Sequence, residues 1–520
     1  MSSYEGGGGR VEMLSPKEIG LPPKFTEWQT GQERIITGML YPMSRYHTFS
    51  VPTGGGKTVC YVSSALISGK RTLILTSTKG LQDQLSREFG KLVAVVKGQG
   101  SYRCKLSDNK YMCNTGSCHW GFKCPFKTAC GEDLCNYQRA LQEGRKASIV
   151  VTNYSFWMSN APDILGEFKT LVMDEAHDAA EHLLGALSME IKREEVYGLI
   201  KWIPPGLSMS NYYEWAKVLR GIVDDTVKKS GGQERRGRYS ILSLQRKLQL
   251  LSKLWVDNWV VEHKGHSISW DVIWPAPLAQ SYLFRGIPHI VLTSATVTKA
   301  DLIMLGITGV YEKDSTFEEF PSMIPVANRP VYFIPTVRMD RFITSAGMNA
   351  WAARIDNIVG GRLAYKGIIH TVSYDRADRV CGFSQYKDFM ISHRGKNTNE
   401  EIVRFKEADP PSILVSPSVV TGYDFPGDEA RYQIIGKLPF PDNRPLVMKA
   451  RQKVNPDYGC YLAIKQLVQA SGRIARTPED WGDTFVIDSH LQWVLSKYRG
   501  IIPKWWMASV KTTNIVPKSR

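Results

Sequence analysis

The sequence has no long hydrophobic run: nothing among its 520 residues approaches the ~20 consecutive apolar residues of a membrane span. Its first residues, MSSYEGGGGRVEML, lack the apolar core of a secretory signal, so we expect a cytoplasmic protein. Acidic residues are also scarce, because 50 Asp and Glu stand against 66 Lys and Arg, a formal net charge of +16. This excess favours a polyanionic partner, with nucleic acid foremost, over a merely basic surface.

Cysteine is rare outside one segment. Six of the nine cysteines lie between Cys104 and Cys135. Disulfides are uncommon in the cytoplasm, so clustered cysteines more often bind a metal. Zinc favours two Cys-x2-Cys pairs, whereas neighbouring cysteines here are separated by eight, four, five, five and four residues. An iron–sulfur cluster also takes four thiolates. The segment predicts a metal-binding insert, with zinc or an iron–sulfur cluster as the alternatives.

Short apolar runs that break into polar or glycine-containing sequence recur along the chain. Such runs are typical of parallel strands that helices cover on both faces. They predict an α/β fold with two parallel-sheet lobes, divided near the proline-rich segment 321–330. Ligands are expected at the carboxyl ends of the strands. The predicted strands are HTFSVPTG, RTLILTST, ASIVVTNY, TLVMDEAH and HIVLTSAT in the first lobe, and GIIHTVSY, SILVSPS, RYQIIGKLP and TFVIDSH in the second.

The first strand ends in VPTGGGKT, which is typical of a phosphate-binding loop. Glycines allow the backbone N–H groups to surround a phosphate, a lysine reaches the β- and γ-phosphates, and a hydroxyl is offered to Mg²⁺. Val51 stands where the strict pattern has glycine. The residues predicted to bind ATP here are Thr53, Gly54, Gly55, Gly56, Lys57 and Thr58.

Two further motifs complete a site for phosphoryl transfer. Asp174 and Glu175, in DEAH at the end of the strand TLVM, are predicted to hold Mg²⁺ and to activate water, respectively. In QASGRIAR, Arg473 and Arg476 lie on one helical face and are predicted to stabilise the γ-phosphate across a cleft, with Gln469 beside them. The predicted catalytic residues are therefore Lys57, Asp174, Glu175, Gln469, Arg473 and Arg476.

With these residues in place the sequence resembles the XPD/DinG group of iron–sulfur helicases in superfamily 2, over roughly residues 25 to 495. The other matching segments, in family order, are WQTGQERI around Gln32, TSTKGLQDQL (76–85), VTNYSF (151–156), TSAT (293–296), IIHTVSY (368–374) and VSPSVVTGYDFPGD (415–428). The resemblance implies two RecA-like domains that use ATP to move 5′ to 3′ on single-stranded DNA. It also implies a nucleotide contact from Gln32, and from Asp424 a contact either with the nucleotide or with the DNA side. The candidate DNA contacts are Thr76, Lys79, Tyr154 and Tyr374 from the motifs, and Trp120 among the cations of the insert.

The resemblance also gives the domain layout. Residues 1–97, 146–185 and 266–325 are expected to form helicase domain 1, and residues 326–520 helicase domain 2. An iron–sulfur insert is expected at 98–145. A helical Arch insert, short for the family, is expected at 186–265, where apolar residues at 241, 244, 248, 251 and 255 follow a helical period.

A 4Fe–4S cluster is what the family carries in the insert. KGQGSYRC resembles the entry to its first ligand and CNYQRA the exit from its last. The preferred ligands are Cys104, Cys124, Cys130 and Cys135, with Cys113 and Cys118 as rivals.

The sequence therefore predicts an ATP-dependent 5′–3′ DNA helicase. It would act on single-stranded and forked DNA with ATP, Mg²⁺ and a 4Fe–4S cluster, as a monomer in a bacterial cell or phage-infected host. The alternatives are an RNA helicase, or a zinc-bearing, ATP-gated nucleic-acid clamp that does not unwind. Intact catalytic motifs disfavour the clamp, whereas discrimination of the 2′-hydroxyl cannot be deduced from these residues.

Overall fold

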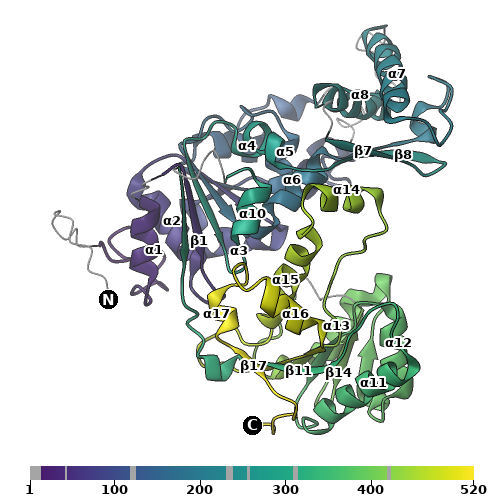
Figure 1. Cartoon of the computed structure of the whole chain (residues 1–520). Helices are drawn as coiled ribbons and strands as arrows, with labels where there is room; N and C mark the ends of the chain where they lie inside the picture. Colours follow the sequence, from purple (N-terminus) through teal and green to yellow (C-terminus); the bar gives the residue numbers. More distant parts are fainter. Residues whose placement is uncertain are drawn as a thin grey trace.

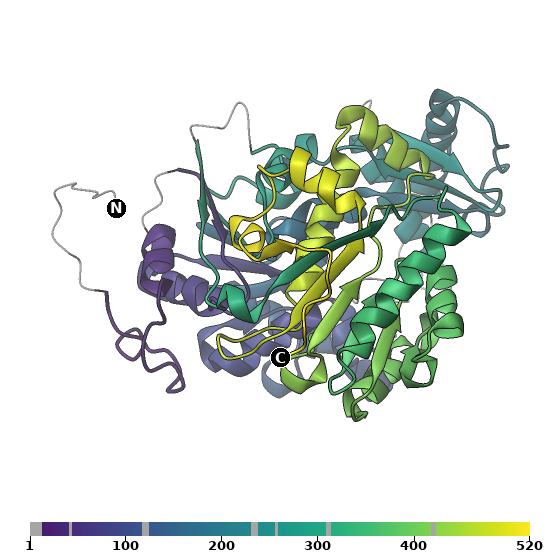
Figure 2. The same ribbon diagram turned by 60° about the horizontal axis from the view of Figure 1, so that its bottom comes forward.

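Two lobes, each built on a seven-stranded parallel sheet, make up the body of the protein (Figure 1). The computed structural model describes residues 13–40, 44–116, 124–229, 238–254, 258–307, 314–417 and 423–520. Figure 2 brings the green and yellow second lobe in front of the purple and teal first lobe. All nine predicted strands are present, and the α/β fold with two RecA-like lobes is confirmed.

Lobe 1 has the strand order β10-β1-β9-β5-β2-β4-β3, with every pair parallel. Its central strands are buried at every position because helices cover both faces, which accounts for their continuous apolar runs. The strands are β1 (Tyr46–Ser50), β2 (Thr72–Thr76), β3 (Ala94–Val95), β4 (Ile149–Asn153), β5 (Thr170–Asp174), β9 (His289–Ser294) and β10 (Ser315–Glu319).

Lobe 2 has the order β13-β14-β12-β15-β16-β11-β17, again parallel throughout. The chain crosses from the first sheet to the second between Glu319 and Val331. The strands are β11 (Val331–Val337), β12 (Gly367–His370), β13 (Met390–Ser392), β14 (Ile413–Ser416), β15 (Tyr432–Ile435), β16 (Asp483–Asp488) and β17 (Val510–Thr512).

Helices cover these sheets and form the connections between strands. Those of lobe 1 are α1 (Gln32–Leu40), α2 (Lys57–Ser68), α3 (Lys79–Phe89), α4 (Asn136–Lys146), α5 (Tyr154–Ser159), α6 (Ala179–Leu187), α9 (Ala276–Ala279) and α10 (Lys299–Met304). Those of lobe 2 are α11 (Ser345–Gly360), α12 (Tyr374–Phe383), α13 (Thr398–Glu407), α14 (Leu446–Val454), α15 (Tyr458–Ser471), α16 (His490–Lys497) and α17 (Lys504–Met507).

The predicted Arch insert is a helical hairpin on a small sheet. Helices α7 (Met209–Lys229) and α8 (Arg238–Lys253) pack on each other. Leu244, Leu248 and Leu251 are buried and Ile241 is half-buried, as their period predicts, whereas position 255 lies outside the described residues. Beneath them lies an antiparallel sheet of β6 (Met189–Lys192), β8 (Ser267–Val272) and β7 (Trp259–His263). The insert is therefore not purely helical, and its last strand, β8, lies wholly beyond the expected boundary at residue 265.

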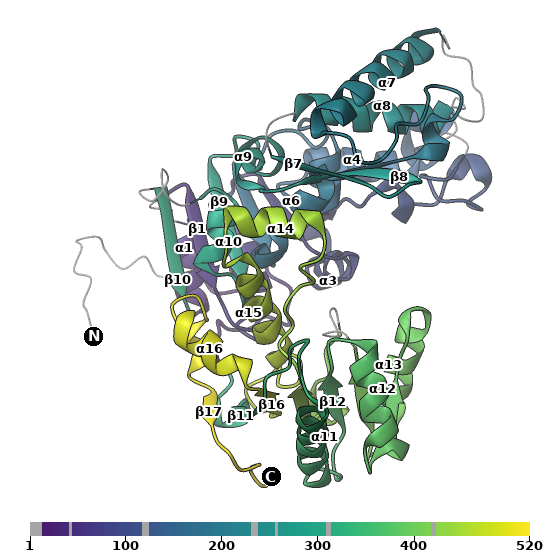
Figure 3. The same ribbon diagram turned by 45° about the vertical axis from the view of Figure 1, so that its right-hand side comes forward.

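Lobe 2 contacts the base of this insert. In Figure 3, α14 lies directly below the β7–β8 hairpin. Arg451 of α14 donates to the carbonyl oxygens of Val272 (2.9 Å) and Ile273 (3.1 Å). Among the described residues no helix combines the length and the apolar character required to cross a membrane.

Candidate nucleotide site between the lobes

The phosphate-binding loop joins β1 to α2, and its glycines are required by its geometry. Gly54 and Gly56 have φ of 84° and 67°, a region that side chains disfavour. A Cβ on Gly55 would lie 2.6 Å from Val51 Cγ1, and one on Gly56 would lie 2.1 Å from Gln32 Nε2. Lys57 and Thr58 then begin α2, so the loop presents a helix N-terminus, which favours phosphate.

Gln32 lies over this loop, as the prediction of a nucleotide contact requires. It is buried at the start of α1, and its side-chain oxygen accepts from the Gln29 backbone N–H at 2.9 Å. The resulting turn holds the Gln32 amide beside Gly56.

Asp174 ends β5 and is buried beside the loop. Its carboxylate accepts from Tyr61 Oη at 3.2 Å and from the Glu175 backbone N–H at 3.0 Å. The Tyr61 hydroxyl also interacts with the Thr58 side chain, so Asp174 and Thr58 share one neighbour. Burial, reinforced by the Glu175 carboxylate, raises the pKa of Asp174. A buried carboxylate and a hydroxyl at this position fit the oxygen ligands that Mg²⁺ prefers.

Glu175 has φ 51° and ψ 46°, which turns its side chain out of the strand toward the loop. Its carboxylate lies 4.0 Å from Lys57 Nζ and accepts from Ser294 Oγ at 3.1 Å. Burial would raise the pKa of Glu175, but the Lys57 ammonium and a hydrogen bond with His177 outweigh it and hold that pKa well below its usual range. The carboxylate is therefore ionised, as a general base must be.

Sequence reasoning missed the partnership of His177 and Ser294, which lie 117 positions apart. His177 Nδ1 lies 2.6 Å from Ser294 Oγ and 3.2 Å from the Glu175 carboxylate. Burial disfavours the charged imidazole, yet its hydrogen bonds with Asp178 and Glu175 raise the pKa of His177 to about 9. The two side chains fix the orientation of the base. Only their positions at the ends of adjacent strands, β5 and β9, could have indicated this contact.

Lobe 2 contributes the other predicted catalytic groups. The Gln469 amide contacts His177 Nε2 directly across the cleft. Arg476 pairs with Asp424 at 2.9 Å, and Arg473 lies 3.8 Å from the same carboxylate while donating to Tyr423 O at 2.7 Å. Asp424, predicted as a nucleotide contact, therefore holds both arginines within lobe 2.

The two lobes meet at the phosphate loop. A Cβ on Gly54 would lie 3.1 Å from the Arg476 carbonyl oxygen, and one on Gly472 would lie 3.6 Å from Thr53 Oγ1. The six predicted catalytic residues are thereby gathered around one junction.

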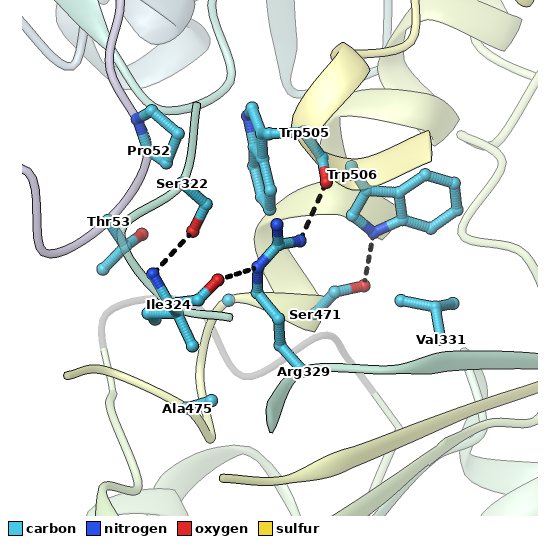
Figure 4. A pocket seen from close by; sticks show the side chains of 11 residues that line it. Pro52, Thr53, Ser322, Ile324, Arg329, Val331, Ser471, Ala475, Trp505 and Trp506 are labelled. Atoms are coloured by element: carbon cyan, nitrogen blue, oxygen red, sulfur yellow. Dashed lines mark hydrogen bonds between the residues drawn. The ribbon is translucent and has the colours of Figure 1, made fainter. Parts of the chain in front are cut away.

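A small pocket borders this junction (Figure 4). Pro52 and Thr53 line one side, with two tryptophans of α17 opposite. Trp505 Nε1 donates to Ala295 O in lobe 1 at 3.2 Å, and Trp506 Nε1 donates to Ser471 Oγ in lobe 2 at 3.0 Å. These consecutive side chains join TSAT to QASGRIAR, a contact that the sequence did not indicate.

The cysteines of the insert gather only in part. Cys104, Cys113 and Cys135 are buried, Cys124 is half-buried and Cys130 is exposed. The Cys113 and Cys135 sulfurs lie 3.9 Å apart. Within the described residues no group of three or more Cys, His, Asp or Glu could hold a metal ion.

The thiol chemistry of the insert nevertheless fits an iron–sulfur cluster, because Cys104, Cys113 and Cys135 are buried within the insert and the sulfurs of Cys113 and Cys135 lie 3.9 Å apart. The insert is closely packed around Cys104: a Cβ on Gly116 would lie 2.5 Å from Cys104 Sγ. The rival ligand Cys118 and the candidate DNA contact Trp120 lie outside the described residues.

Two of the predicted DNA contacts are inaccessible to a strand. Tyr154 is fully buried, and its hydroxyl donates to the Asp174 carbonyl oxygen at 3.0 Å. Thr76 is also fully buried and donates to Thr78 O at 3.3 Å. Both predictions of direct contact are therefore wrong, because these two side chains are packed in the interior beneath the motifs. Lys79 at the start of α3 and Tyr374 at the start of α12 are exposed.

Comparison with known proteins agrees with this architecture. Residues 29–194 match the DEAD/DEAH box helicase family, and residues 366–509 match the helicase C-terminal domain. A 62-residue segment is 40% identical to the ATP-dependent DNA helicase YoaA of Haemophilus influenzae, and the matched part covers 10% of either chain.

Solved structures extend the likeness to the whole fold. An XPD helicase aligns with 93% of this chain and 98% of its own, at 15% identity and a TM-score of 0.62. Xpd4 of S. tokodaii aligns with 93% of this chain and all of its own, at 14% identity and a TM-score of 0.58. The two family matches fall on the two lobes, which carry the DEAD/DEAH box helicase and helicase C-terminal domains, and the chain as a whole has a fold similar to that of XPD helicases.

Proposed function

We propose that the protein is an ATP-driven motor that moves 5′ to 3′ on single-stranded DNA and unwinds duplex or forked DNA. The observation that carries the proposal is the junction at which Lys57, Glu175 and Arg476 come from three separate elements of two lobes. A nucleic-acid substrate is supported by the net charge of +16, and DNA in particular by the DNA helicase to which one segment is similar. The polarity is taken from the resemblance to the family.

ATP would bind with its phosphates in the loop 52–58, where backbone N–H groups and Lys57 hold them. Thr58 and Asp174 would hold Mg²⁺, which when bound neutralises charge on the β- and γ-phosphates. Glu175 would orient a water molecule and take its proton as the water oxygen attacks the γ-phosphorus. The bond to the β-phosphate oxygen breaks, which leaves ADP and inorganic phosphate.

Arg473 and Arg476 would stabilise the transferred phosphoryl group. Both now bind Asp424, so the γ-phosphate competes with a carboxylate for them. Because the arginines belong to lobe 2 and the loop to lobe 1, productive geometry requires the lobes to be docked. Hydrolysis and release would then alternate docking with separation, which can advance the lobes along a strand.

We propose that the insert carries a 4Fe–4S cluster held by Cys104, Cys124 and Cys135, as the sequence predicted. Burial and the 3.9 Å approach to Cys135 support Cys113 as the fourth ligand in place of the exposed Cys130. The cluster would fold a segment that has few regular elements of its own.

The test is ATP hydrolysis and strand separation by the full chain, purified without oxygen. Substrates are a duplex with a 5′ single-stranded tail, the same duplex with a 3′ tail, and an RNA copy of the first. We expect hydrolysis that single-stranded DNA stimulates, and unwinding of the 5′-tailed DNA alone. The Lys57→Ala variant should lose hydrolysis. Equal unwinding of the RNA copy would favour the RNA helicase, and hydrolysis without unwinding of any duplex would favour the clamp.

A further inference from the structure

A buried lysine of lobe 2 crosses into lobe 1 directly behind the catalytic base. Lys465 lies in the middle of α15 and is only 7% exposed. Its Nζ lies 2.6 Å from Glu181 Oε1, 3.1 Å from the His177 carbonyl oxygen and 3.8 Å from Asp178 Oδ1. Lysine is almost never buried to this degree unless it is paired, so these contacts account for its position.

The surroundings of Lys465 keep its ammonium charged. Burial alone would lower the pKa of Lys465, but Glu181, Asp301 and Asp178 outweigh it and raise that pKa. These carboxylates come from α6, from α10 and from the loop after β5, all in lobe 1. Separation of the lobes would leave them without their buried cation, so the pairing favours the docked state.

The contact with His177 links this ion pair to the chemistry. Lys465 holds the backbone of His177, whose ring lies against Ser294 and the Glu175 carboxylate. Gln469, four residues later on the same face of α15, contacts the other ring nitrogen. Arg473 follows after four more. One side of α15 therefore presents a cation and an amide to the loop that carries the base, whereas Arg473, beyond the end of the helix, is held by Tyr423 and Asp424 inside lobe 2.

We propose that Lys465 is a positioning residue for ATP hydrolysis: it fixes the loop that carries Glu175 only when lobe 2 is docked. The inference rests on the proposed ATPase. Lys465 does not reach the nucleotide, so its loss should impair the orientation of the water and leave ATP binding largely intact. Displacement of a catalytic group by about 1 Å can cost on the order of 100-fold in rate.

The experiment compares Lys465→Met with Lys465→Arg in the full chain, with single-stranded DNA present. For Lys465→Met we expect kcat for ATP to fall by 10- to 100-fold, of the order that such a displacement causes, while KM and the affinity for a fluorescent ATP analogue change less than about threefold. Lys465→Arg keeps the cation and should recover most of kcat. Glu181→Gln removes the carboxylate that pairs with Lys465 at 2.6 Å and should also lower kcat.

Lys366 provides a matched control, because it is also a buried lysine but donates to the carbonyl oxygens of Phe405 and Ala408 inside lobe 2. Lys366→Met should reduce thermal stability without a selective loss of kcat. The proposal is overturned if Lys465→Met raises KM at unchanged kcat, leaves both constants unchanged, or loses activity only in proportion to unfolded protein. In each case the ATPase proposal would still hold, provided that the wild type hydrolyses ATP and the Lys57→Ala variant does not.

Discussion

The nucleotide cleft and the cysteine insert both concentrate reactive side chains, yet they are organised in opposite ways. In the cleft, Asp174 and Ser294 stand at the ends of adjacent buried strands, and Lys57 stands at the start of a helix. The positions of these groups are fixed by the sheet before any ligand arrives. The lobe 1 half of the cleft is thus preorganised by the fold itself.

The insert lacks such a framework. Three cysteines directly precede short 3₁₀ turns, at Lys105–Ser107, Pro125–Lys127 and Gly131–Asp133, and a fourth precedes α4. Their thiols range from buried to exposed. The difference teaches that a motif at the edge of a sheet acquires its geometry from the fold, whereas a motif in loops acquires it from the ligand it binds.

Removal of an arginine from the preorganised site should have the largest effect. We expect Arg476→Ala to lower kcat for ATP by on the order of 10³-fold, because a positive charge is lost opposite the transferred phosphoryl group. Steady-state release of phosphate measures this. Arg444→Ala is the control, since Arg444 is exposed and pairs with Asp442. A loss below about tenfold would mean that Arg476 only binds Asp424.

The second prediction concerns the ligand-dependent site. Cys135→Ser should remove the cluster and lower unwinding 10- to 100-fold, a range typical of lost support around a metal centre, with less effect on hydrolysis. Cys130→Ser, at an exposed position, should keep about four irons per chain. Iron and zinc analysis with an absorption spectrum measures both. Iron lost from Cys130→Ser but kept in Cys113→Ser would restore the ligand set that the sequence predicted.

The same substitution, glycine to alanine, can be made in both the phosphate-binding loop and the cysteine insert, which allows the two sites to be compared. An added Cβ would lie 2.6 Å from Val51 at Gly55, and 2.5 Å from the Cys104 sulfur at Gly116. Overpacking of this kind costs about 1–3 kcal/mol. Gly55→Ala should raise KM for ATP by roughly 5- to 150-fold, the range these energies correspond to, and Gly116→Ala should lower the iron content instead.

Gly80→Ala and Gly98→Ala are the controls for the two glycines, with at most a 3.8 Å contact. Loss of ATP binding in the Gly116 variant would show that the two sites are coupled.

The smallest effect is expected at the start of α3. Thr78 caps this helix by accepting from the Leu81 backbone N–H at 3.3 Å. Thr78→Ala should cost about 1 kcal/mol locally, measured as faster hydrogen exchange in the first turn of α3. If ATP hydrolysis in the absence of DNA is unchanged, the geometry of the cleft depends on the sheet and not on this helix cap. A proportionate loss of hydrolysis would contradict it.

How far the sequence predicts the molecule depends on the kind of signal. Strands buried on both faces, such as β5 and β14, have continuous apolar runs and were predicted. Strand β10 was missed because its sequence, STFEE, has no such run, and β11 because Pro335 interrupts it beside an irregular register. The motifs predicted which groups gather at the cleft.

Contacts between distant residues were not predictable in the same way. Burial of Tyr154 and the pairing of His177 with Ser294 depend on how strands lie side by side, which no local pattern encodes. For the same reason the sequence could not decide which four of the six cysteines bind the cluster, since spacing alone does not determine which thiols turn inward.

The hydrogen bonds of Arg451 to the base of the Arch insert couple the insert to lobe 2. Its two hydrogen bonds to Val272 and Ile273 tie lobe 2 to the small sheet under α7 and α8. Helix α7 has 21 residues and is about 30 Å long at ~1.5 Å per residue. A rotation of about 10° at the base would sweep its tip through about 5 Å, given that length. If the lobes separate during hydrolysis as proposed, the hairpin would either move with lobe 2 or lose these two hydrogen bonds.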